Sequence, residues 1–509
     1  MDWPAILRDV LTWHAIVALI GGTIAGLFVG ALPGIGPAVG ISLLLPLSYF
    51  LPVGDALLFY VSLYQAAEYG GSITAIAIRT PGAPNSAAMI LDGYPLNQKG
   101  QSGKAFAYSL WSAIFASYVG IAGLFLLSQP ISGAALALGP AAFAALGLFG
   151  LTAVATLSIG SPLKGIIAGL FGILLSTVGT DLITNVQRFT FRQPALYDGV
   201  PLLAVLVGVF ALPEAIRLLT TNDPEHDIAP VAQPGQYRVW LHWSEFVAVF
   251  KPMSMGTIVG FFMGLLPGVA GTVPPWITYN IAKAMSRRPE RFGTGEPEGI
   301  VAPEATNAAV MHSTLIPAFT LGIPGTPTSA VILGAMVIGG LHPGPLLFTK
   351  NPAVVYELFC GLVLSTAALW VIGLLTTQLW ARMTAVPKKP LAIAIVTLCI
   401  TGVFVSRLNP VDIWICFVFG ALGYAMDRYG FSVPALVLGL ILGSITETNM
   451  RQALLISSGN LLVFLQDPIS LAFLLLAAIA VWGGFWLRKR VLKQTLPDDP
   501  LGPPYADTR

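Results

Sequence analysis

The chain has 509 residues, of which 55% are hydrophobic and 10% are charged. Soluble domains carry about 25% charged residues, and a bilayer core is spanned by roughly 20 apolar residues, a length that recurs along this chain. The composition therefore indicates a polytopic membrane protein and excludes a soluble globular fold, while the net charge of +2 gives no indication of a nucleic-acid surface.

The predicted elements follow from the apolar runs in chain order. The first run begins in MDWPAILRDV with mixed charges and lacks a small-residue cleavage site, so it is predicted to stay as a helix rather than to be removed as a secretory signal. The runs before the polar stretch fall at 14–50, 56–96, 105–128, 134–158, 165–180 and 200–219. Those after it fall at 252–282, 303–341, 354–380, 391–406, 411–426, 431–446 and 469–487.

Four of these runs are interrupted by Pro and Gly, two before the polar stretch and two after it, which indicates an internal repeat. GLFVGALPG at 26–34 matches GFFMGLLPG at 260–268 in six of nine positions, with an offset of 267 − 33 = 234. PGAPNSA at 81–87 matches PGTPTSA at 324–330 in five of seven, with an offset of 324 − 81 = 243. One loop insertion accounts for the difference, and chance similarity among Gly-rich segments is the alternative.

The basic residues near the helix ends predict that the two repeats are inverted, because Lys and Arg mark the cytoplasmic side. The loop SYFLPVGDA lacks them, whereas its counterpart carries Lys283, Arg287, Arg288 and Arg291. Conversely, Lys99 and Lys104 follow the first PGxPxSA element, whereas Lys350 alone follows the second. Three residues fall on the outside and weigh against this scheme: Arg188, Arg192 and Arg407.

The resulting fold prediction is an all-α polytopic membrane protein with two inverted-topology repeats, each containing a re-entrant hairpin and a broken transmembrane helix. The first repeat, 1–219, comprises hairpin 14–50, broken helix 56–96 and scaffold helices 105–219. A polar linker, 220–250, leads to the second repeat, 251–460, with hairpin 252–282, broken helix 303–341 and scaffold helices 354–446. An extra helix at 461–490 and a disordered cytoplasmic tail at 491–509 follow.

The interruptions are the first candidates for binding. Pro and Gly end a helix and free backbone N–H groups, which suit anions, and carbonyl groups, which suit cations. Inverted repeats with broken helices at the midplane are typical of secondary transporters. The alternative is that each Pro-Gly pair kinks a helix or allows close packing, and that each hydroxyl bonds back to its own helix.

The candidate substrate-binding residues lie at the two hairpin tips and the two helix breaks. They are Pro33, Gly34, Ile35, Gly36, Ser72, Arg79, Pro81, Gly82, Asn85, Ser86, Gly268, Thr272, Asn307, Pro324, Gly325, Thr326, Thr328 and Ser329. The candidate cation-binding residues are Gly34, Thr74, Gly268, Glu304 and Thr326, with Na⁺ as the expected ion and H⁺ as the alternative.

Ionisable side chains inside apolar runs form a second group of candidates, since charges are costly in a membrane and usually functional. Glu68 and Glu304 lie at membrane depth. Arg79 lies beside the first helix break, where its guanidinium can bind a carboxylate in a bidentate manner; snorkelling or pairing with Glu68 is the alternative. Asp92 in LDGYPL is expected to cap or turn a helix end.

Catalytic and metal sites are not indicated. The cysteines lie in apolar runs without CxxC pairs and are interpreted as small buried hydrophobic residues: Cys360, Cys399 and Cys416. The five histidines form no ligand pattern, so neither a metal nor a permanently bound cofactor is predicted. An intramembrane enzyme needs convergent catalytic groups, and the apolar runs offer only Glu68 and Glu304, so the prediction is a non-enzyme.

Four blocks of the sequence resemble the large membrane subunit, TctA, of the bacterial tripartite tricarboxylate transporters. They are GLFVGALPGIGPAVGISLLLPL, YGGSITAIAIRTPGAPNSAAMILDGYPL, APEATNAA, and LIPAFTLGIPGTPTSAVILGAM with HPGP. The resemblance runs from the first hairpin to about residue 347 and is vaguer beyond. The sequence departs from the family pattern at Arg79, Met89 and Ala308. These departures bear on which substrate is transported more than on the transport mechanism.

The resemblance implies a multi-pass protein of the bacterial inner membrane that imports di- or tricarboxylates or related organic acids with a cation gradient. It also implies two partners, a small four-helix membrane subunit (TctB-like) and a periplasmic substrate-binding protein (TctC-like), and kinship with elevator-type transporters. Alternatives are a permease without partner subunits and an ion channel, which would use similar breaks but conduct without coupling.

Overall fold

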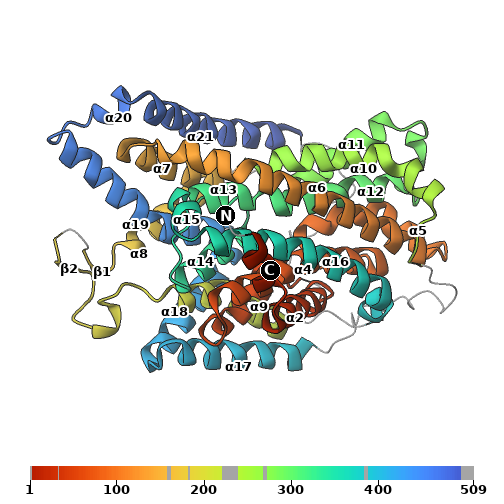
Figure 1. Ribbon diagram of the computed structural model, residues 1–509, viewed down its shortest axis with the longest axis horizontal. Helices are drawn as coiled ribbons and strands as arrows, with labels where there is room; N and C mark the ends of the chain where they lie inside the picture. Colours follow the sequence, from red (N-terminus) through yellow and green to blue (C-terminus); the bar gives the residue numbers. More distant parts are fainter. Residues whose placement is uncertain are drawn as a thin grey trace. The chain divides into compact units, whose positions relative to one another are not determined.

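The computed structural model describes residues 3–32, 34–156, 162–181, 184–220, 239–266, 272–382 and 388–494 (Figure 1). Internal contacts divide the chain into two compact units, each described by itself. Unit 1 is Met1–Ala137 with Leu175–Arg428, and unit 2 is Leu138–Leu174 with Tyr429–Arg509. The hairpins and helix breaks predicted from the sequence all belong to unit 1.

In its described residues, the regular structure of unit 1 is helical apart from one pair of two-residue strands. Its first part contains α1 (Trp3–Val10), α2 (Trp13–Gly30), α3 (Pro37–Leu44), η1 (Leu45–Tyr49), α4 (Val53–Ile78), η2 (Pro84–Met89), α5 (Ile90–Gln98) and α6 (Ser102–Leu136). Next come β1 (Gly179–Thr180), β2 (Gln187–Arg188), η3 (Pro194–Leu196) and α9 (Leu202–Thr220). The remainder is α10 (Trp243–Gly264), α11 (Val273–Met285), η4 (Pro289–Arg291), α12 (Glu298–Ser313), α13 (Leu315–Leu321), α14 (Pro327–Ile338), α15 (Pro345–Lys350), α16 (Pro352–Arg382), α17 (Lys388–Arg407) and α18 (Pro410–Arg428).

Unit 2 consists of α7 (Pro140–Thr156), most of α8 (Pro162–Ser176), α19 (Val433–Ile456), α20 (Val463–Gln466) and α21 (Pro468–Gln494). Helix α7 packs against both α19 and α21. In the same unit, Gly169 of α8 lies directly against Gly439 of α19, so two helices far apart in the sequence approach closely through small residues.

Among the described helices, eight are long and apolar enough to cross a membrane: α2, α6, α9, α10, α16, α17, α18 and α19. This bears out a polytopic, mostly helical protein. Helices α4 and α12 are not in this set, yet every residue from Tyr60 to Ala77 and from Gly299 to Ser313 is buried. Because protein surrounds these two helices on all sides, they can carry polar residues that a lipid-facing helix could not.

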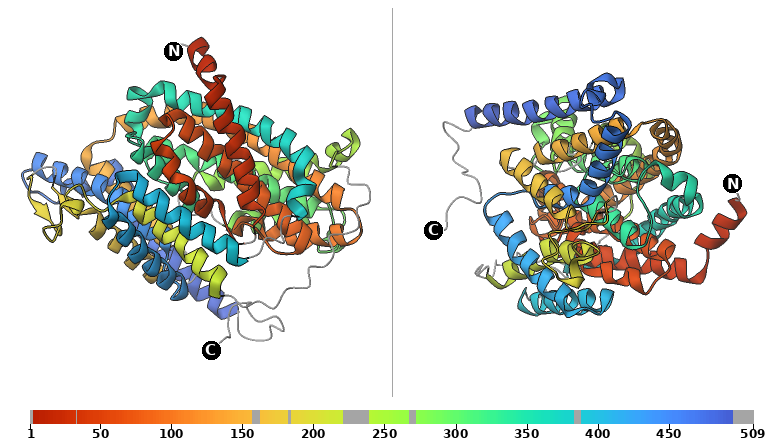
Figure 2. Two further views of the ribbon diagram at one scale, coloured as in Figure 1. Left: turned by 90° about the horizontal axis from the view of Figure 1, so that it is seen from below. Right: turned by 90° about the vertical axis from the view of Figure 1, so that its left-hand side faces the viewer.

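Helices α2 and α4 pack in parallel, and their residue numbers rise together along the contact (Figure 2). Gly22 faces Phe59, Gly26 faces Leu63 and Gly30 faces Ala67. The two helices also begin together, since His14 Nδ1 lies 3.6 Å from Asp55 Oδ2. The intervening chain, 31–52, therefore turns back to the level at which α2 started.

Helices α10 and α12 repeat this arrangement in the second half of the chain. Gly256 faces Ala302, Gly260 faces Thr306 and Gly264 faces Val310. The glycines of α10 follow those of α2 by 256 − 22 = 234 residues, and their partners on α12 follow those on α4 by 302 − 59 = 243. These are the two offsets of the matched sequence motifs, so the motif matches and the packing relate the same residues.

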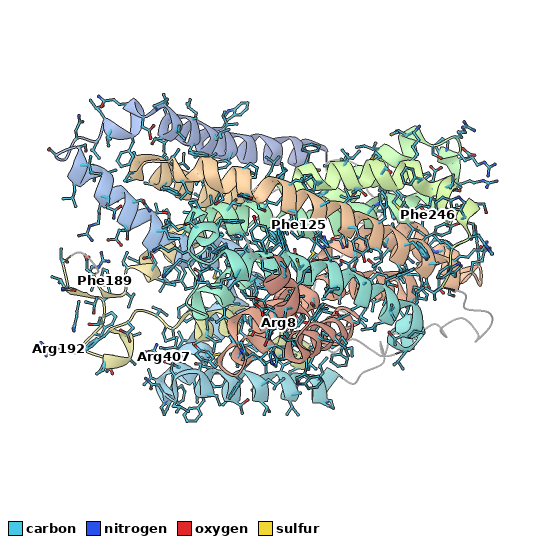
Figure 3. The ribbon with its side chains drawn as sticks, viewed as in Figure 1. Arg8, Phe125, Phe189, Arg192, Phe246 and Arg407 are labelled. Atoms are coloured by element: carbon cyan, nitrogen blue, oxygen red, sulfur yellow. The ribbon has the colours of Figure 1, made fainter. Side chains whose placement is uncertain are left out.

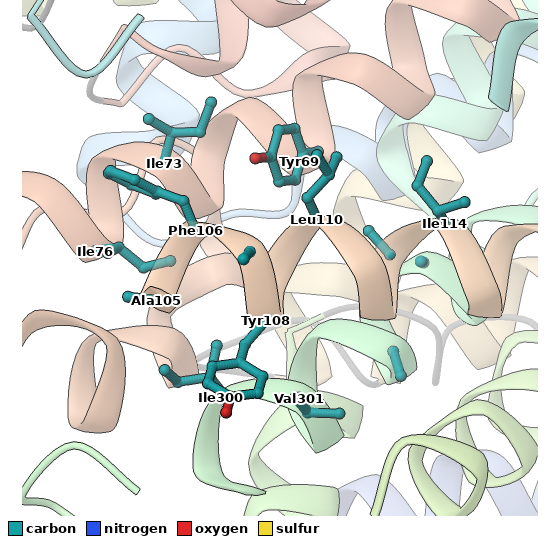
Figure 4. Close-up of a cluster of buried hydrophobic side chains, with 14 of the residues drawn as sticks. Tyr69, Ile73, Ile76, Ala105, Phe106, Tyr108, Leu110, Ile114, Ile300 and Val301 are labelled. Atoms are coloured by element: carbon teal, nitrogen blue, oxygen red, sulfur yellow. The ribbon is translucent and has the colours of Figure 1, made fainter. Parts of the chain in front are cut away.

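The two halves of the chain are joined by a shared apolar core and by crossed contacts. Tyr69 and Ile73 of α4, Phe106 of α6 and Ile300 of α12 belong to one buried cluster (Figure 4). Helix α3 contacts α14, and α11 contacts η2. Each hairpin of one half therefore packs against the break of the other half.

Several boundaries differ from those that the sequence suggested. The linker prediction extended to residue 250, but α10 begins at Trp243, where the Glu245 side chain accepts a hydrogen bond of 3.0 Å from the His242 backbone N–H and so fixes the start of the helix. Residues 221–238 of that linker lie outside the described residues. The second broken helix is interrupted twice, because Thr314 separates α12 from α13 before the predicted break. Helix α21 continues to Gln494, and residues 495–509 of the predicted tail lie outside the described residues.

Candidate functional site

The first helix break is a turn that folds back onto α4. Helix α4 ends at Ile78, and Arg79 takes the left-handed conformation with φ 60° and ψ 20°. The Gly82 N–H then donates to the Gly71 carbonyl at 3.2 Å, and the Ser86 hydroxyl donates to the same carbonyl at 3.0 Å. A Cβ at Gly82 would overlap the Gly30 carbonyl oxygen, so only glycine fits here. Pro81, directly before Gly82, is half-buried.

The second break also begins with a residue in the left-handed conformation, and the helix after it is capped at its start. Gly322 ends α13 with φ 74°, and Pro324 and Gly325 follow, both buried. Thr326 caps α14 reciprocally with Ser329: the Ser329 N–H donates to Thr326 Oγ1 at 3.1 Å, and the Thr326 N–H donates to Ser329 Oγ at 3.0 Å.

The first hairpin tip lies beside the first break. Gly34 has φ 84°, Ile35 is buried, and Gly36 is the N-cap of α3. A Cβ placed on Gly36 would lie 3.8 Å from Pro84 Cδ at the start of η2. Pro33 and Gly268 lie outside the described residues, and Thr272 is the N-cap of α11 at the second tip.

Glu214 also approaches the first tip, although the sequence did not single it out. Its Oε1 would lie 3.4 Å from a Cβ on Gly34, and its Oε2 lies 3.6 Å from Arg217 Nη1. Glu214 is buried in α9, inside the apolar run FALPEAIRLL. The rule that an acid within an apolar run is usually functional would have found it.

Glu68 connects the first break to α12. It accepts hydrogen bonds from Asn85 Nδ2, at 3.3 Å to Oε1 and 3.4 Å to Oε2, and from Asn307 Nδ2 at 3.3 Å to Oε2. Glu304 accepts a hydrogen bond of 2.9 Å from Ser109 Oγ of α6 and lies beside the Ser72 hydroxyl. Both carboxylates are buried, with exposed fractions of 5% and 1%.

Other predicted residues have local partners. Thr74 donates to the Gly71 carbonyl at 3.0 Å, in agreement with the alternative that hydroxyls bond back to their own helix. Thr326 Oγ1 lies 3.2 Å from the Tyr64 hydroxyl, and Thr328 is buried nearby. Arg79 is exposed and lies over the Tyr94 ring at 6.0 Å, and the described ion pairs do not join it to Glu68.

A basic cleft of about 420 Å³ opens where the loop after the first break meets the loop after the second hairpin. Lys99, Lys104, Arg288 and Arg291 line it together with Glu296. Lys99 Nζ donates to the Thr294 carbonyl at 2.5 Å, and Lys104 Nζ lies 3.2 Å from Glu245 Oε1. Burial, followed by the neighbouring charge of Glu298, raises the pKa of the Glu296 carboxyl.

Asp92 holds these two loops together. Its Oδ1 accepts from the backbone N–H groups of Gly293, Gly295 and Glu296 at 2.8 to 2.9 Å, and its Oδ2 accepts from the Tyr279 hydroxyl at 2.9 Å. The expectation that Asp92 caps a turn holds, but the turn it caps lies 201 residues further along the chain.

Comparison with known proteins identifies the family. A model of the tripartite tricarboxylate transporter TctA family matches residues 16–438. The chain belongs to the TctA family. As a TctA protein it is a membrane transporter subunit rather than an enzyme, in agreement with the breaks and the apolar helices described above.

Two relatives of this TctA protein come from Agrobacterium vitis. An uncharacterised 52.8 kDa protein in TAR-I ttuC' 3'region is 35% identical over 468 residues, which is 92% of each chain. An uncharacterised protein in TAR-II ttuC' 3'region is 34% identical over 222 residues, 44% of this chain and 92% of the relative. No solved structure matches the chain.

Proposed function

We propose that the chain is the large transmembrane subunit of a binding-protein-dependent, cation-coupled secondary transporter. It imports di- or tricarboxylates or related organic acids across the bacterial inner membrane. Its partners are a small four-helix membrane subunit and a periplasmic substrate-binding protein. The coupling cation is Na⁺, with H⁺ as the alternative.

The observation that carries this proposal is the crossed packing of the hairpins and breaks. Helices α3, α11 and α14 each begin with proline in the first turn, directly after a tip or a break. The N-terminus of a helix carries partial positive charge and unpaired N–H groups, which suit a carboxylate. Because α3 contacts α14 and α11 contacts η2, the ends of both halves converge on one region of unit 1.

The equivalent packing of α2 on α4 and of α10 on α12 supports two repeats. The basic loops, which change sides between the repeats, support their inversion in the membrane. In transporters of this kind the paired hairpins and broken helices move as a body past the remaining helices. We therefore propose an elevator-like mechanism, in which the substrate travels with the tips at 33–37 and 267–272 and the breaks at 81–86 and 324–329.

The test is uptake by proteoliposomes that contain the chain and its small membrane subunit. Radiolabelled di- and tricarboxylates are offered with and without the binding protein, and with and without an inward Na⁺ or H⁺ gradient. We expect saturable uptake that needs the binding protein and one gradient. Uptake without the binding protein would indicate a stand-alone permease, and non-saturating flux without a gradient would indicate a channel.

A matched pair of variants ties the uptake to the second break. Thr326→Val removes the hydroxyl at the start of α14, and uptake should fall about tenfold, equivalent to 1.4 kcal/mol. Thr349→Val is the control, because Thr349 is an exposed hydroxyl of α15 that bonds to the Leu346 carbonyl of its own helix. Equal uptake by the two variants would exclude Thr326 from the site.

A further inference from the structure

A small cavity with polar and apolar lining residues lies inside unit 1, between α4, α6, α12 and α16. Its volume is about 10 Å³, the space of one water molecule. The polar residues that line it are Gln65, Glu68, Ser117, Glu304, Asn307 and His312. The cavity is therefore lined by both buried carboxylates and is separate from the helix N-termini to which substrate binding is assigned above.

The amide of Gln65 turns an oxygen without a partner toward the cavity. Its Nε2 donates to Thr366 Oγ1 at 2.7 Å, and the Thr366 hydroxyl itself donates to the Leu362 carbonyl at 2.8 Å. Thr366 has thus used its proton and must accept from Gln65, which fixes the orientation of the amide. Gln65 Oε1 is buried and, within the described structure, has no hydrogen-bond partner.

Asn307 and His312 add two further acceptors by the same reasoning. Asn307 directs its Nδ2 at the Glu68 carboxylate, which leaves Oδ1 unpaired among the described atoms. His312 Nδ1 lies 2.8 Å from the Ala308 carbonyl, which can only accept, so Nδ1 carries the proton and Nε2 is an acceptor. Nε2 is buried and has no partner among the described residues.

The cavity thus gathers acceptors and negative charge without a positive counterpart. Among the residues that the structure describes, the ion pairs of Lys and Arg do not include Glu68 or Glu304. Both carboxylates line the same small cavity, so their like charges repel one another there. Buried charges of one sign are stable only when a proton or a cation neutralises one of them.

We propose that this cavity binds one monovalent cation, Na⁺ or a proton, between Glu68 and Glu304. The inference rests on the proposed cation-coupled transport and places the coupling cation at a defined site. Of the cation-binding residues suggested by the sequence, it keeps Glu304. It replaces the other four with Glu68, Gln65 Oε1 and Asn307 Oδ1: Gly34, Thr74, Gly268 and Thr326. When the bound cation is a proton, His312 Nε2 accepts a hydrogen bond from the protonated carboxyl group.

The cation is linked to the first break through Asn85. The Asn85 amide donates to both oxygens of Glu68, and Asn85 belongs to η2, directly after Pro81 and Gly82. A cation bound to Glu68 takes one of these oxygens from Asn85. Occupancy of the cavity therefore changes the hydrogen bonds that hold η2 in place, which is how the ion can act on the substrate region.

The test measures thermal unfolding of the purified full-length chain in NaCl and in choline chloride of equal ionic strength, at acidic, neutral and alkaline pH. If Na⁺ binds, NaCl raises Tm of the wild-type chain by roughly 2–4 °C at alkaline pH. If a proton binds, Tm falls as the pH rises, with or without Na⁺. Either dependence should be absent from Glu68→Gln and Glu304→Gln. The control Glu290→Gln, an exposed carboxyl of η4 that does not line the cavity, should keep it.

Three other titratable groups face the two carboxylates in the described structure: Tyr64 and Tyr69 of α4, and His312 of α12. From α6 and α16 the polar groups are hydroxyls, including Ser109, Ser117 and Thr366, which do not titrate in this range. His312→Asn therefore shows whether protonation of the imidazole causes a pH dependence. If this variant loses the dependence and both glutamine variants keep it, the inference is wrong.

Binding of radioactive Na⁺ to the same proteins gives a second readout, with one ion bound per wild-type chain in the Na⁺ case. The inference is overturned if Glu68→Gln and Glu304→Gln respond to Na⁺ and pH as the wild type does. The cation site and the proposed function are tested independently. Gradient-driven uptake that persists in both glutamine variants rejects the cavity as the cation site but not the transport function. A cation response without any carboxylate uptake rejects the transporter but not the cavity.

Discussion

Arg79 adopts a backbone conformation that residues other than glycine rarely take. The equivalent position at the second break, 243 residues further along the chain, is Gly322. Its φ is 74°, compared with 60° for Arg79. The left-handed conformation costs a non-glycine residue roughly 1–2 kcal/mol. The cost of this conformation indicates that the arginine side chain has a role of its own. Its exposed guanidinium lies beside the first break, where it is suited to bind an incoming carboxylate.

Two substitutions separate the backbone of Arg79 from its side chain. Arg79→Gly should raise Tm because it relieves the strained φ, whereas Arg79→Ala should not, since alanine keeps the strain. If the guanidinium binds substrate, both variants should lose uptake by about tenfold or more. Normal uptake by Arg79→Ala would remove Arg79 from the substrate site. A Tm of Arg79→Gly below that of Arg79→Ala would contradict the strain.

Asp92 is a structural residue whose importance the hydrogen bonds make explicit. Asp92→Ala would leave three backbone N–H groups of the 293–296 loop and the Tyr279 hydroxyl without their acceptor. Each hydrogen bond to a charged group contributes about 1.5–3 kcal/mol, so we expect a large fall in Tm and in the yield of folded protein. The control is Asp198→Ala, because Asp198 is exposed. Equal Tm values for the two variants would contradict this role.

At the residue scale the sequence predicted the polar side chains but not their partners. Glu68, Asn85, Glu304 and Asn307 were candidates because polar groups inside apolar runs are unusual. Gln65 and His312 were missed, since one has a partner 301 residues away and histidines without a ligand pattern suggest no site. Such long-range contacts depend on which helices become neighbours, and a single sequence does not encode that in any local pattern.

At the element scale, glycine stripes determine how α2 packs on α4 and α10 on α12. A Cβ on Gly26 would overlap the Leu63 carbonyl oxygen, and one on Gly260 would lie 2.5 Å from that of Thr306. Gly26→Ala and Gly260→Ala should therefore each destabilise the chain by about 1–3 kcal/mol through overpacking. The control is Gly133→Ala in α6, where a Cβ has no described atom within 4 Å.

These substitutions are read out as Tm and as the fraction of monodisperse protein after extraction from the membrane. Gly133→Ala should equal or exceed the wild type, because alanine favours the helix by up to about 1 kcal/mol. If Gly26→Ala and Gly260→Ala behave like Gly133→Ala, the close parallel packing of the two helix pairs is wrong.

The breaks themselves were predictable, whereas several helix ends were not. Pro and Gly cannot continue a helix, and the described interruptions at 34–36, 79–83 and 322–326 coincide with the Pro-Gly motifs. The early start of α10 at Trp243 depends on the hydrogen bond between His242 and Glu245, and the additional break at Thr314 comes before Pro317, which has no N–H for the Ser313 carbonyl. Hydropathy does not report these, because the residues on either side are equally apolar.

At the scale of the whole molecule, the positions of the charged loops support the predicted topology. The scheme places 99–104 and 283–291 both in the cytoplasm, and the structure brings these loops together through Lys99, Thr294 and Asp92. Two of the three arginines that weigh against the scheme hold a local structure. Arg188 Nη1 lies 3.7 Å from Asp181 Oδ2, and Arg407 Nε lies 3.7 Å from Asp412 Oδ2.

Arg188 lies in β2, and Arg407 at the end of α17 reaches η3, which follows that strand in the chain (Figure 3). Arg407 Nη2 donates to the Ala195 carbonyl at 3.4 Å, so it anchors this segment to the corner between α17 and α18. A side chain retained for such a contact carries little information about topology. Arg188 and Arg407 therefore count only weakly against the inverted topology that the other basic residues predict.

The inversion of the repeats is tested by the side from which four new cysteines react. The positions are exposed in the structure, with Phe50 at 66%, Phe191 at 81%, Met285 at 47% and Tyr429 at 63%. Each is changed to cysteine in a background where Cys360, Cys399 and Cys416 are alanine, a change that suits their apolar surroundings. Intact cells whose outer membrane admits the reagent are treated with a membrane-impermeant maleimide, and lysed cells serve as the reference.

The inverted scheme predicts that Phe50→Cys and Phe191→Cys react in intact cells, whereas Met285→Cys and Tyr429→Cys react only after lysis. Phe50 follows the first hairpin and Met285 the second, so this pair reports directly on the inversion. Phe191 and Tyr429 lie in loops outside both hairpins and establish which side is which. If Phe50→Cys and Met285→Cys react from the same side, the hairpins enter from one side and the repeats are parallel. Opposite reactivity of Phe191→Cys and Tyr429→Cys would then show that the labelling itself distinguishes the two sides.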